Sequence, residues 1–155
     1  MKRGKIRPIA VCIVIEGGNI LVQEGFDHVK NEVFYRPLGG KIKFGELGSM
    51  TVVRELFEEI EAELHDIRYL GTLESIFTYN GDDGHEIVLI FSGKIINLNL
   101  FPDQTIMRYE SDGEPIKAVW LPLTTFIEYD RNFHNNRKPL LYPDGLTNII
   151  KNFYG

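Results

Sequence analysis

The sequence predicts an α+β domain in which helices and sheet form layers. Runs of β-branched apolar residues are separated by short turn-forming segments, which indicates hairpins. Residues 49–64 repeat apolar side chains at spacings of three and four, which indicates an amphipathic helix. Because hairpins and helices are mixed along the chain, α+β or α/β/α layering fits better than a doubly wound parallel sheet.

The N-terminal part predicts a hairpin and a short strand. Residues 8–15 form a β-branched run, the turn Glu-Gly-Gly-Asn follows at 16–19, and a second apolar run occupies 20–22. This order is typical of a β-hairpin. Residues 34–38 predict a strand that is not central in a sheet, because it contains a proline. The pair Gly39-Gly40 predicts a loop after that strand.

The clearest helix is predicted between residues 49 and 64, with Ser49 as its N-cap. At about 100° per residue, Glu55, Glu58 and Glu59 fall within an arc of about 100° on one side. The opposite side is predicted to pack against the core. Its apolar members are Val53, Leu56, Phe57, Ile60 and Leu64.

The C-terminal half predicts a second hairpin and several further elements. Turn formers at 80–84 separate predicted strands at 67–77 and 87–91. No repeat or linker divides the chain, so residues 1–155 are predicted to form one domain. The remaining elements are a strand at 118–121 and helices at 123–129 and 146–153.

Composition excludes several classes of protein. Lys and Arg total 17 against 22 Asp and Glu, and the net charge of −5 has the wrong sign for binding a nucleic acid polymer. No stretch approaches the roughly 20 apolar residues that cross a bilayer. The single cysteine, Cys12, lies in an apolar run, so it is predicted to be a core residue without a disulfide partner. We therefore expect a cytoplasmic protein that binds neither a membrane nor a nucleic acid polymer.

The three glutamates of the predicted helix repel one another, which is understandable if a cation lies between them. Clustered carboxylate oxygens favour hard ions such as Mg²⁺ or Mn²⁺. Taken alone, such a cluster is more often a solvated charged face. Residues upstream favour a functional site over a solvated face, because glycine, glutamate and arginine stand at fixed offsets before the cluster. The whole pattern has a chance on the order of one in 10⁸ per starting position.

Residues 40–62 resemble the Nudix box, in which a glycine, five residues and a glutamate are followed after seven residues by Arg-Glu-aliphatic-any-Glu-Glu-any-Gly-aliphatic. The one departure is Glu61, which stands where the family has glycine. Residues 36–40 and 119–122 also look like parts of a Nudix domain. The resemblance implies a Nudix-like α/β/α sandwich with a mixed sheet over residues 1–155. The matching positions are Gly40, Glu46, Arg54, Glu55, Leu56, Glu58 and Glu59.

The implied activity is divalent-metal-dependent hydrolysis of a pyrophosphate bond in a nucleoside diphosphate linked to another moiety. Substrates of this class include nucleotide sugars, dinucleoside polyphosphates and nucleoside triphosphates. The implied cofactor is Mg²⁺ or Mn²⁺, which makes water nucleophilic and stabilises phosphoryl charge. The alternative is a non-catalytic Nudix-like module that senses a nucleotide. Retention of all three glutamates favours the enzyme.

The resemblance also implies roles for particular residues. Glu58 and Glu59 would be metal ligands, and the Gly39 carbonyl another. Glu55 would be a further ligand or the base that takes the proton of water. Arg54 would orient these carboxylates, although an ordinary ion pair with Glu58 is the alternative.

Other catalytic candidates rest on weaker signals. Glu46 would tie the loop to the start of the helix. Many Nudix enzymes add an acidic residue from a late loop, and Glu114 is favoured over Glu110 and Asp112 for this role. The pair His85-Glu86 at the start of a strand is a further candidate to approach the metal. A solvated side chain is the alternative for each of these loop residues.

Two residues are candidates for binding the small-molecule nucleotide. Arg36 precedes the box and offers forked donors to a phosphate, with a surface ion pair as the alternative. Tyr79 lies where diadenosine polyphosphate members of the family carry a tyrosine, and its ring would stack on a base. Phe77 offers the same chemistry.

Glu61 and the oligomeric state give two further expectations. Glycine at the end of the box implies a left-handed residue, so we expect the helix to end near Ile60 with Glu61 at positive φ rather than to continue through Leu64. Families of this kind commonly dimerise, which leaves a homodimer open. We expect no exposed apolar stripe to identify an interface.

Overall fold

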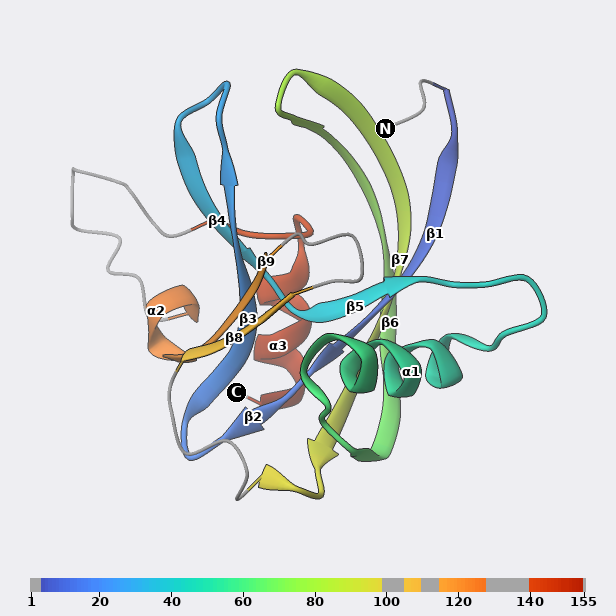
Figure 1. Ribbon diagram of the computed structural model, residues 1–155, viewed down its shortest axis with the longest axis vertical. Helices are drawn as coiled ribbons and strands as arrows, with labels where there is room; N and C mark the ends of the chain where they lie inside the picture. The colour runs from blue at the N-terminus through green and yellow to red at the C-terminus, as the bar shows by residue number, and fades with distance from the viewer. Residues whose placement is uncertain (1–3, 99–104, 110–114, 128–139, 155) are drawn as a thin grey trace.

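A computed structural model gives the fold and describes residues 4–98, 105–109, 115–127 and 140–154. These residues form two β-sheets, with α1 (Gly48–Ile60) on one side and α3 (Leu146–Tyr154) on the other (Figure 1). The predicted α+β class and its layered arrangement are confirmed.

In the described part of the chain, the first sheet has the strand order β5–β1–β7–β6. Strands β1 and β7 run parallel and the other neighbours run antiparallel, so the sheet is mixed as predicted. The bounds are Ile6–Ile13 for β1, Leu38–Lys41 for β5, Leu64–Tyr79 for β6 and Asp82–Ile95 for β7.

The second sheet has the order β10–β4–β3–β9–β8, and β2 also pairs with β3. Strand β3 (Asn19–Asp27) is its centre, between β4 and β9. The other bounds are Ile15–Glu16 for β2, Glu32–Arg36 for β4, Thr105–Tyr109 for β8, Pro115–Pro122 for β9 and Leu140–Leu141 for β10.

Strand β1 is buried on both faces, which explains its uninterrupted apolar run. Ala10 and Cys12 pack in the cluster that contains Leu56 of α1. Val11 packs in the cluster that contains Ile150 of α3. Cys12 is therefore a core residue, as predicted, and burial raises the pKa of its thiol.

Both predicted hairpins are present, although the first apolar run is divided between β1 in the first sheet and β2 in the second. Gly17 and Gly18 join β2 to β3 with φ of 55° and 78°. Asn80 and Gly81 join β6 to β7 with φ of 49° and 85°. Two consecutive positive φ angles match the twist of the flanking strands and favour glycine or asparagine.

The strand predicted at 34–38 and the loop predicted at Gly39-Gly40 are partly wrong. Strand β4 ends at Arg36, and β5 begins at Leu38 in the other sheet. Pro37 stands between them, where it has no ladder hydrogen bond to donate. The glycine pair belongs to β5, and the loop begins after it.

The start of α1 differs from the prediction. Its N-cap is Leu47 rather than Ser49, and no side-chain hydrogen bond caps it. The two short predictions near the C-terminus agree better, with α2 at Thr124–Ile127 and α3 one residue longer than expected. Among the described residues, none of the helices has the length and apolar character needed to cross a membrane.

The predicted core face of α1 is also partly wrong. Val53 and Phe57 are 40% and 54% exposed, whereas Val52 and Glu59 are buried. The helix is thus rotated so that part of its carboxylate side borders the core. Gly40 permits this rotation because it has no side chain to hold α1 away from β5.

This rotation leaves an exposed apolar stripe along α1 and the loop before it, where we expected none. The homodimer itself stays a prediction. The stripe consists of Phe44, Leu47, Met50, Val53 and Phe57.

Glu61 closes α1 with φ of 59° and ψ of 25°, which confirms the left-handed prediction. Its backbone N–H donates to the Phe57 carbonyl at 2.8 Å, and the next N–H, of Ala62, donates to the Leu56 carbonyl at 3.2 Å. These bonds use carbonyls that the end of a helix leaves without helical partners. The helix therefore ends before the predicted alternative at Leu64, which belongs to β6.

Candidate active site

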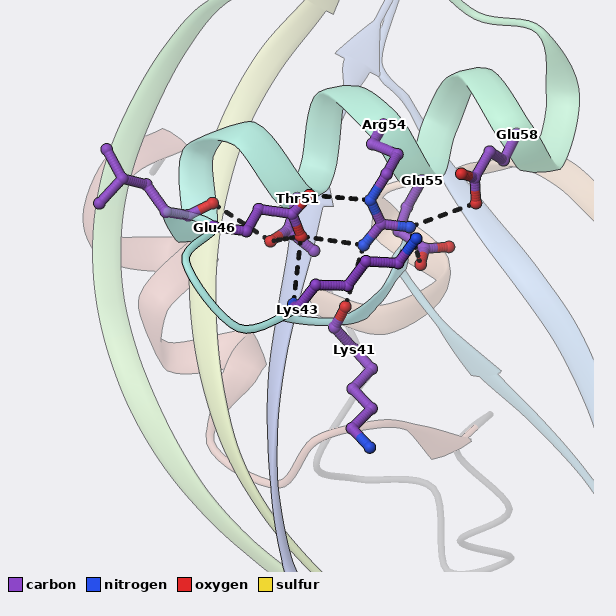
Figure 2. A network of polar contacts seen from close by, with 8 residues as sticks. Lys41, Lys43, Glu46, Thr51, Arg54, Glu55 and Glu58 are labelled. Carbon is purple, nitrogen blue, oxygen red and sulfur yellow. Dashed lines mark hydrogen bonds and ion pairs between the residues drawn. The ribbon is translucent and has the colours of Figure 1, made fainter.

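Arg54 is the centre of a polar network that joins α1 to the loop before it (Figure 2). Its Nε and Nη2 donate to the two oxygens of Glu46 at 2.8 and 2.9 Å. Its Nη1 donates to Glu55 at 2.9 Å and to Glu58 at 3.2 Å. Nη2 also donates to the Lys41 carbonyl at 3.0 Å. These contacts occupy all of the N–H groups that an arginine side chain offers.

Glu46 joins the loop to the helix, as the sequence predicted. Its carboxylate also accepts hydrogen bonds from the Thr51 hydroxyl at 2.6 Å and from the Lys43 backbone N–H at 3.3 Å. The hydrogen bonds from Arg54 and then Thr51 lower the pKa of Glu46 to about 2. The same contact raises the pKa of Arg54. Both partners therefore stay charged over the whole physiological range.

The two glycines of β5 bring the helix and the first sheet into close contact. A Cβ atom on Gly40 would lie 2.4 Å from Cδ of Glu55. A Cβ atom on Gly39 would lie 2.1 Å from the carbonyl oxygen of Ala10 in β1. Neither position has room for a side chain, so Glu55 packs directly on the backbone of β5.

The two remaining box glutamates differ in exposure. The Glu58 side chain is 52% exposed, whereas Glu59 is only 7% exposed. Together with Glu55 and the Gly39 carbonyl they offer only oxygen donors, which suits a hard divalent ion. Within the described residues, no three acidic, histidine or cysteine side chains are gathered closely enough to hold an ion. In this structure Arg54 forms ion pairs with both Glu55 and Glu58 and so sets the positions of their carboxylates.

A cleft of about 470 Å³ lies between the two sheets, and we call it the intersheet cleft. Both predicted substrate residues, Arg36 and Tyr79, line it, and so does Phe77. Arg36 is exposed, and the Tyr79 ring stands edge-on to Phe34 at a centroid distance of 5.6 Å. The fold thus brings to one cavity residues that are far apart in the sequence.

The cleft and the box meet at β5. Gly39 pairs with Val11 of β1, and the Val11 side chain lines the cleft. Arg36 precedes Gly39 by three residues, so their Cα atoms lie within about 11 Å of each other. Gly39, which adjoins the box, therefore lies near the part of the cleft that Arg36 lines.

Several cleft residues were not predicted for this role. Glu86 lies here, where its Oε2 accepts a hydrogen bond from Arg7 at 2.7 Å. Arg7, Ile9 and Val11 are alternate residues of β1 and all line the cleft. Because alternate residues of a strand point to the same side, the sequence could have indicated that Arg7 shares a face with Ile9 and Val11. Phe34 could have been noticed in the same way. No pattern in the sequence indicates that residues of the two sheets line one cleft.

The late acidic residues expected to assist catalysis lie outside the described residues. Glu114, the favoured one, therefore stays a prediction, as do the two alternatives before it. The three residues are Glu110, Asp112 and Glu114.

Comparisons with known proteins agree with this geometry. The family model described as NUDIX domain matches residues 6–142. No curated protein sequence matches significantly. Among solved structures, an ADP compounds hydrolase is 18% identical, with a TM-score of 0.59 over 97% of this chain and 74% of that one. A MutT NUDIX hydrolase from Burkholderia pseudomallei is 19% identical, with a TM-score of 0.54 over 77% and 84% of the respective chains. The E. coli ORF135 protein is 18% identical, with a TM-score of 0.51 over 96% and 89%. At these identities the structures show a shared fold.

Proposed function

Because the chain belongs to the NUDIX domain family, we propose that it hydrolyses the pyrophosphate bond of a nucleoside diphosphate linked to a further group. The chain is a pyrophosphohydrolase of the Nudix type. The observation that carries the proposal is the Arg54 network, which holds Glu55 and Glu58 together through one guanidinium group. Charged groups held in fixed positions are what phosphoryl transfer requires.

The proposed cofactor is Mg²⁺ or Mn²⁺, in line with the family's general use of a divalent ion. Glu58 and Glu59 would hold it, with Glu55 and the Gly39 carbonyl as further donors. When bound, such an ion stabilises charge on phosphoryl oxygens and lowers the pKa of water. Glu58 is exposed enough to exchange its hydrogen bond with Arg54 for an ion without disturbing the fold.

The chain's own residues have distinct proposed parts. Glu55, which packs on β5 near the end of the cleft, is the candidate base for the attacking water. Arg54 acts as a positioning residue, since its five donors set the directions of the glutamates around it. Arg36 binds a phosphate of the substrate through its forked donors. Tyr79 stacks on the base.

A non-catalytic nucleotide sensor is the second candidate function. The observation in its favour is that Arg54 already pairs with Glu55 and Glu58, so both carboxylates have a cationic partner without a metal ion. Against it, three adjacent carboxylates on one helix serve no obvious purpose in a module that only binds. The two functions differ in whether any nucleotide is consumed.

A hydrolysis panel with identification of the products tests the proposal. The panel contains nucleotide sugars, dinucleoside polyphosphates and nucleoside triphosphates, each with Mg²⁺, with Mn²⁺ and with EDTA. One structural neighbour is called an ADP compounds hydrolase, so ADP-linked compounds belong in the panel. We expect metal-dependent release of a nucleotide from at least one class. Binding of nucleotides without hydrolysis in any class would establish the sensor instead.

A further inference from the structure

The wall of the cleft on the first sheet is arranged in rows. Strand pairing places Arg7, Glu86 and Ser75 in one row across β1, β7 and β6. Two residues further along β6, toward the hairpin tip, Phe77 pairs with Gly84 of β7. The three polar residues and Phe77 all line the cleft.

The wall on the second sheet repeats this arrangement. Gln23 of β3 pairs with Arg36 of β4, and two residues nearer the tip Gly25 pairs with Phe34. All of them line the cleft. Each wall thus has a polar row and, nearer the tips, an aromatic row. The polar row consists of Arg7, Gln23, Arg36, Ser75 and Glu86, and the aromatic row consists of Phe34 and Phe77.

Hydrogen bonds join the tips of the two hairpins. The buried carboxylate of Asp27 accepts a hydrogen bond from the Asn80 backbone N–H at 3.1 Å. The Asn80 side-chain oxygen accepts one from the His28 N–H at 2.7 Å, and Lys30 Nζ donates to the Thr78 carbonyl at 2.7 Å. Both hairpins rise toward the top of the view in Figure 1. The rows recur every two residues from these tips, and across the cleft the Phe34 ring of one hairpin stands edge-on to Tyr79 of the other at a centroid distance of 5.6 Å.

Each aromatic ring has a glycine beneath it on the neighbouring strand. A Cβ atom on Gly25 would lie 2.4 Å from Cζ of Phe34, and one on Gly84 would lie 2.3 Å from Cζ of Phe77. The far end of each ring therefore rests on its own wall. The Phe34 ring also makes edge-to-face contacts with Tyr79 and Tyr142, both at a centroid distance of 5.6 Å, and this cluster offers rings on which a planar ligand can stack.

The polar row has charges that folding alone does not explain. Glu86 is 12% exposed and pairs with Arg7 through only one of its oxygens, Oε2. Among the described residues, the buried Nε of Arg7 has no hydrogen-bond partner. The Arg7 side chain is 36% exposed, and an ion pair that is partly exposed and has an unsatisfied donor adds little stability. Such a pair, which lies next to the aromatic row, is suited to forming hydrogen bonds with the polar edge of a ligand.

We propose that the cleft selects a guanine base, with its ring stacked on the aromatic side chains of the cleft, Tyr79 included, and its polar edge on Arg7 and Glu86. The inference rests on the proposed function, since it names the nucleoside of the same substrate. Guanine offers adjacent N1–H and N2–H donors to a carboxylate, and O6 and N7 acceptors to a guanidinium. Adenine places a ring acceptor where guanine has N1–H, and a carboxylate repels it. It also has an amino group in place of O6, which a guanidinium repels.

Equilibrium binding of GDP and ADP in EDTA tests this without relying on hydrolysis. The two ligands differ only in the base, so isothermal titration of the parent should give an affinity for GDP about 10-fold or more above that for ADP. Glu86→Gln keeps the size and one acceptor but removes the carboxylate. The ratio should then fall to within about threefold. Glu32→Gln, an equal change of charge in the same cleft but nearer the tips, should leave the ratio unchanged.

A ligand-side change gives an independent test if the Glu86 variant does not fold. Inosine diphosphate lacks only the N2 amino group of GDP. We expect the parent to bind it about 5-fold or more weakly than GDP, because one charge-assisted hydrogen bond is lost. In folded Glu86→Gln the two ligands should bind nearly equally.

Equal affinities of the parent for GDP and ADP would overturn the base assignment, and so would a ratio that survives Glu86→Gln. If no member of the panel were hydrolysed but the GDP preference held, the proposed reaction would fail and the inference would stand. If guanine and adenine substrates were hydrolysed alike and bound alike, the inference alone would fail.

Discussion

The Arg54 network and the intersheet cleft are built in opposite ways. The network lies within residues 41–58, on one helix and the loop before it, and a single guanidinium holds its carboxylates. The cleft takes its walls from both sheets, with lining residues from Arg7 to Pro143. Its shape depends on strand pairing and on the Asp27–Asn80 link between hairpins.

This difference separates what the family shares from what the individual chain selects. A network made of neighbours in sequence can form a motif, and in the proposed function this network supports the reaction. The described lining residues of the cleft lie on six strands and the loops between them, so substitutions at many distant positions can change its shape. We therefore expect variants in the network to lower kcat and variants in the cleft to change KM or substrate preference.

Gly40→Ala adds only one carbon, and we expect it to have the largest effect on kcat among such small changes. Its Cβ would overlap the Glu55 carboxyl group, and displacement of that group should lower kcat by about 100-fold or more. The matched control is Gly45→Ala, which has open space around its Cβ but a φ of 81°. The control should lose about 1–2 kcal/mol of stability to backbone strain and keep its kcat. Equal kcat values for the two variants would break the comparison.

Tyr79→Ala tests the cleft in the same terms. Loss of stacking on a base removes about 1–3 kcal/mol of binding, so KM should rise roughly 5- to 150-fold while kcat changes little. Tyr69→Ala on the same strand, outside the cleft, is the control and should leave both constants unchanged. Steady-state kinetics on the best substrate supply the measurement. A fall in kcat at constant KM would move Tyr79 into the reaction itself.

The acid stability of the network should depend on Glu46. Its folded-state pKa is lowered from 4.5 to about 2, so its contribution is fully present above pH 4.5 and is lost as the pH falls toward 2. Thermal unfolding of the parent and of Glu46→Gln, followed from pH 7 to pH 2, should give a difference in Tm that shrinks across that window. A difference that stays constant with pH would mean that the ion pair with Arg54 does not stabilise the fold.

The smallest expected effect is that of Glu61→Gly. Glycine adopts the φ of 59° at this position without strain, so the free energy of unfolding should rise by about 0.5–1 kcal/mol after its greater freedom in the unfolded chain is counted. The kinetic constants should not change, because the carboxylates lie upstream on α1. Destabilisation, measured by urea unfolding, would show that Glu61 makes a contact worth more than the strain.

The features that could be predicted from the sequence are those that depend on near neighbours. The box spacing, the end of α1 at Ile60 and the turns at Gly17-Gly18 and Asn80-Gly81 all follow from local backbone and side-chain requirements. The rotation of α1 could not be predicted in this way. It depends on β5, where Gly40 admits Glu55 and so leaves Phe57 exposed.

The two edge strands of the second sheet and the cleft could not be predicted either, because they too depend on residues that are distant in the sequence. Strand β8 is an edge strand of five residues, and β10 has only two, so their pairing partners rather than their own patterns define them. Within the cleft, Arg7 and Glu86 are 79 positions apart and meet only because β1 and β7 run parallel in one register. Single residues such as Arg36 and Tyr79 could be proposed, but their common cavity could not.

The most direct test of the account is kcat for Glu58→Gln and Glu59→Gln with saturating Mg²⁺. Each change removes one negative oxygen from the proposed metal site and keeps the size of the side chain. We expect folded proteins, checked by circular dichroism, whose kcat is lower by about 100-fold or more. A kcat within a few-fold of the parent for both variants would contradict the claim that the box glutamates carry the reaction.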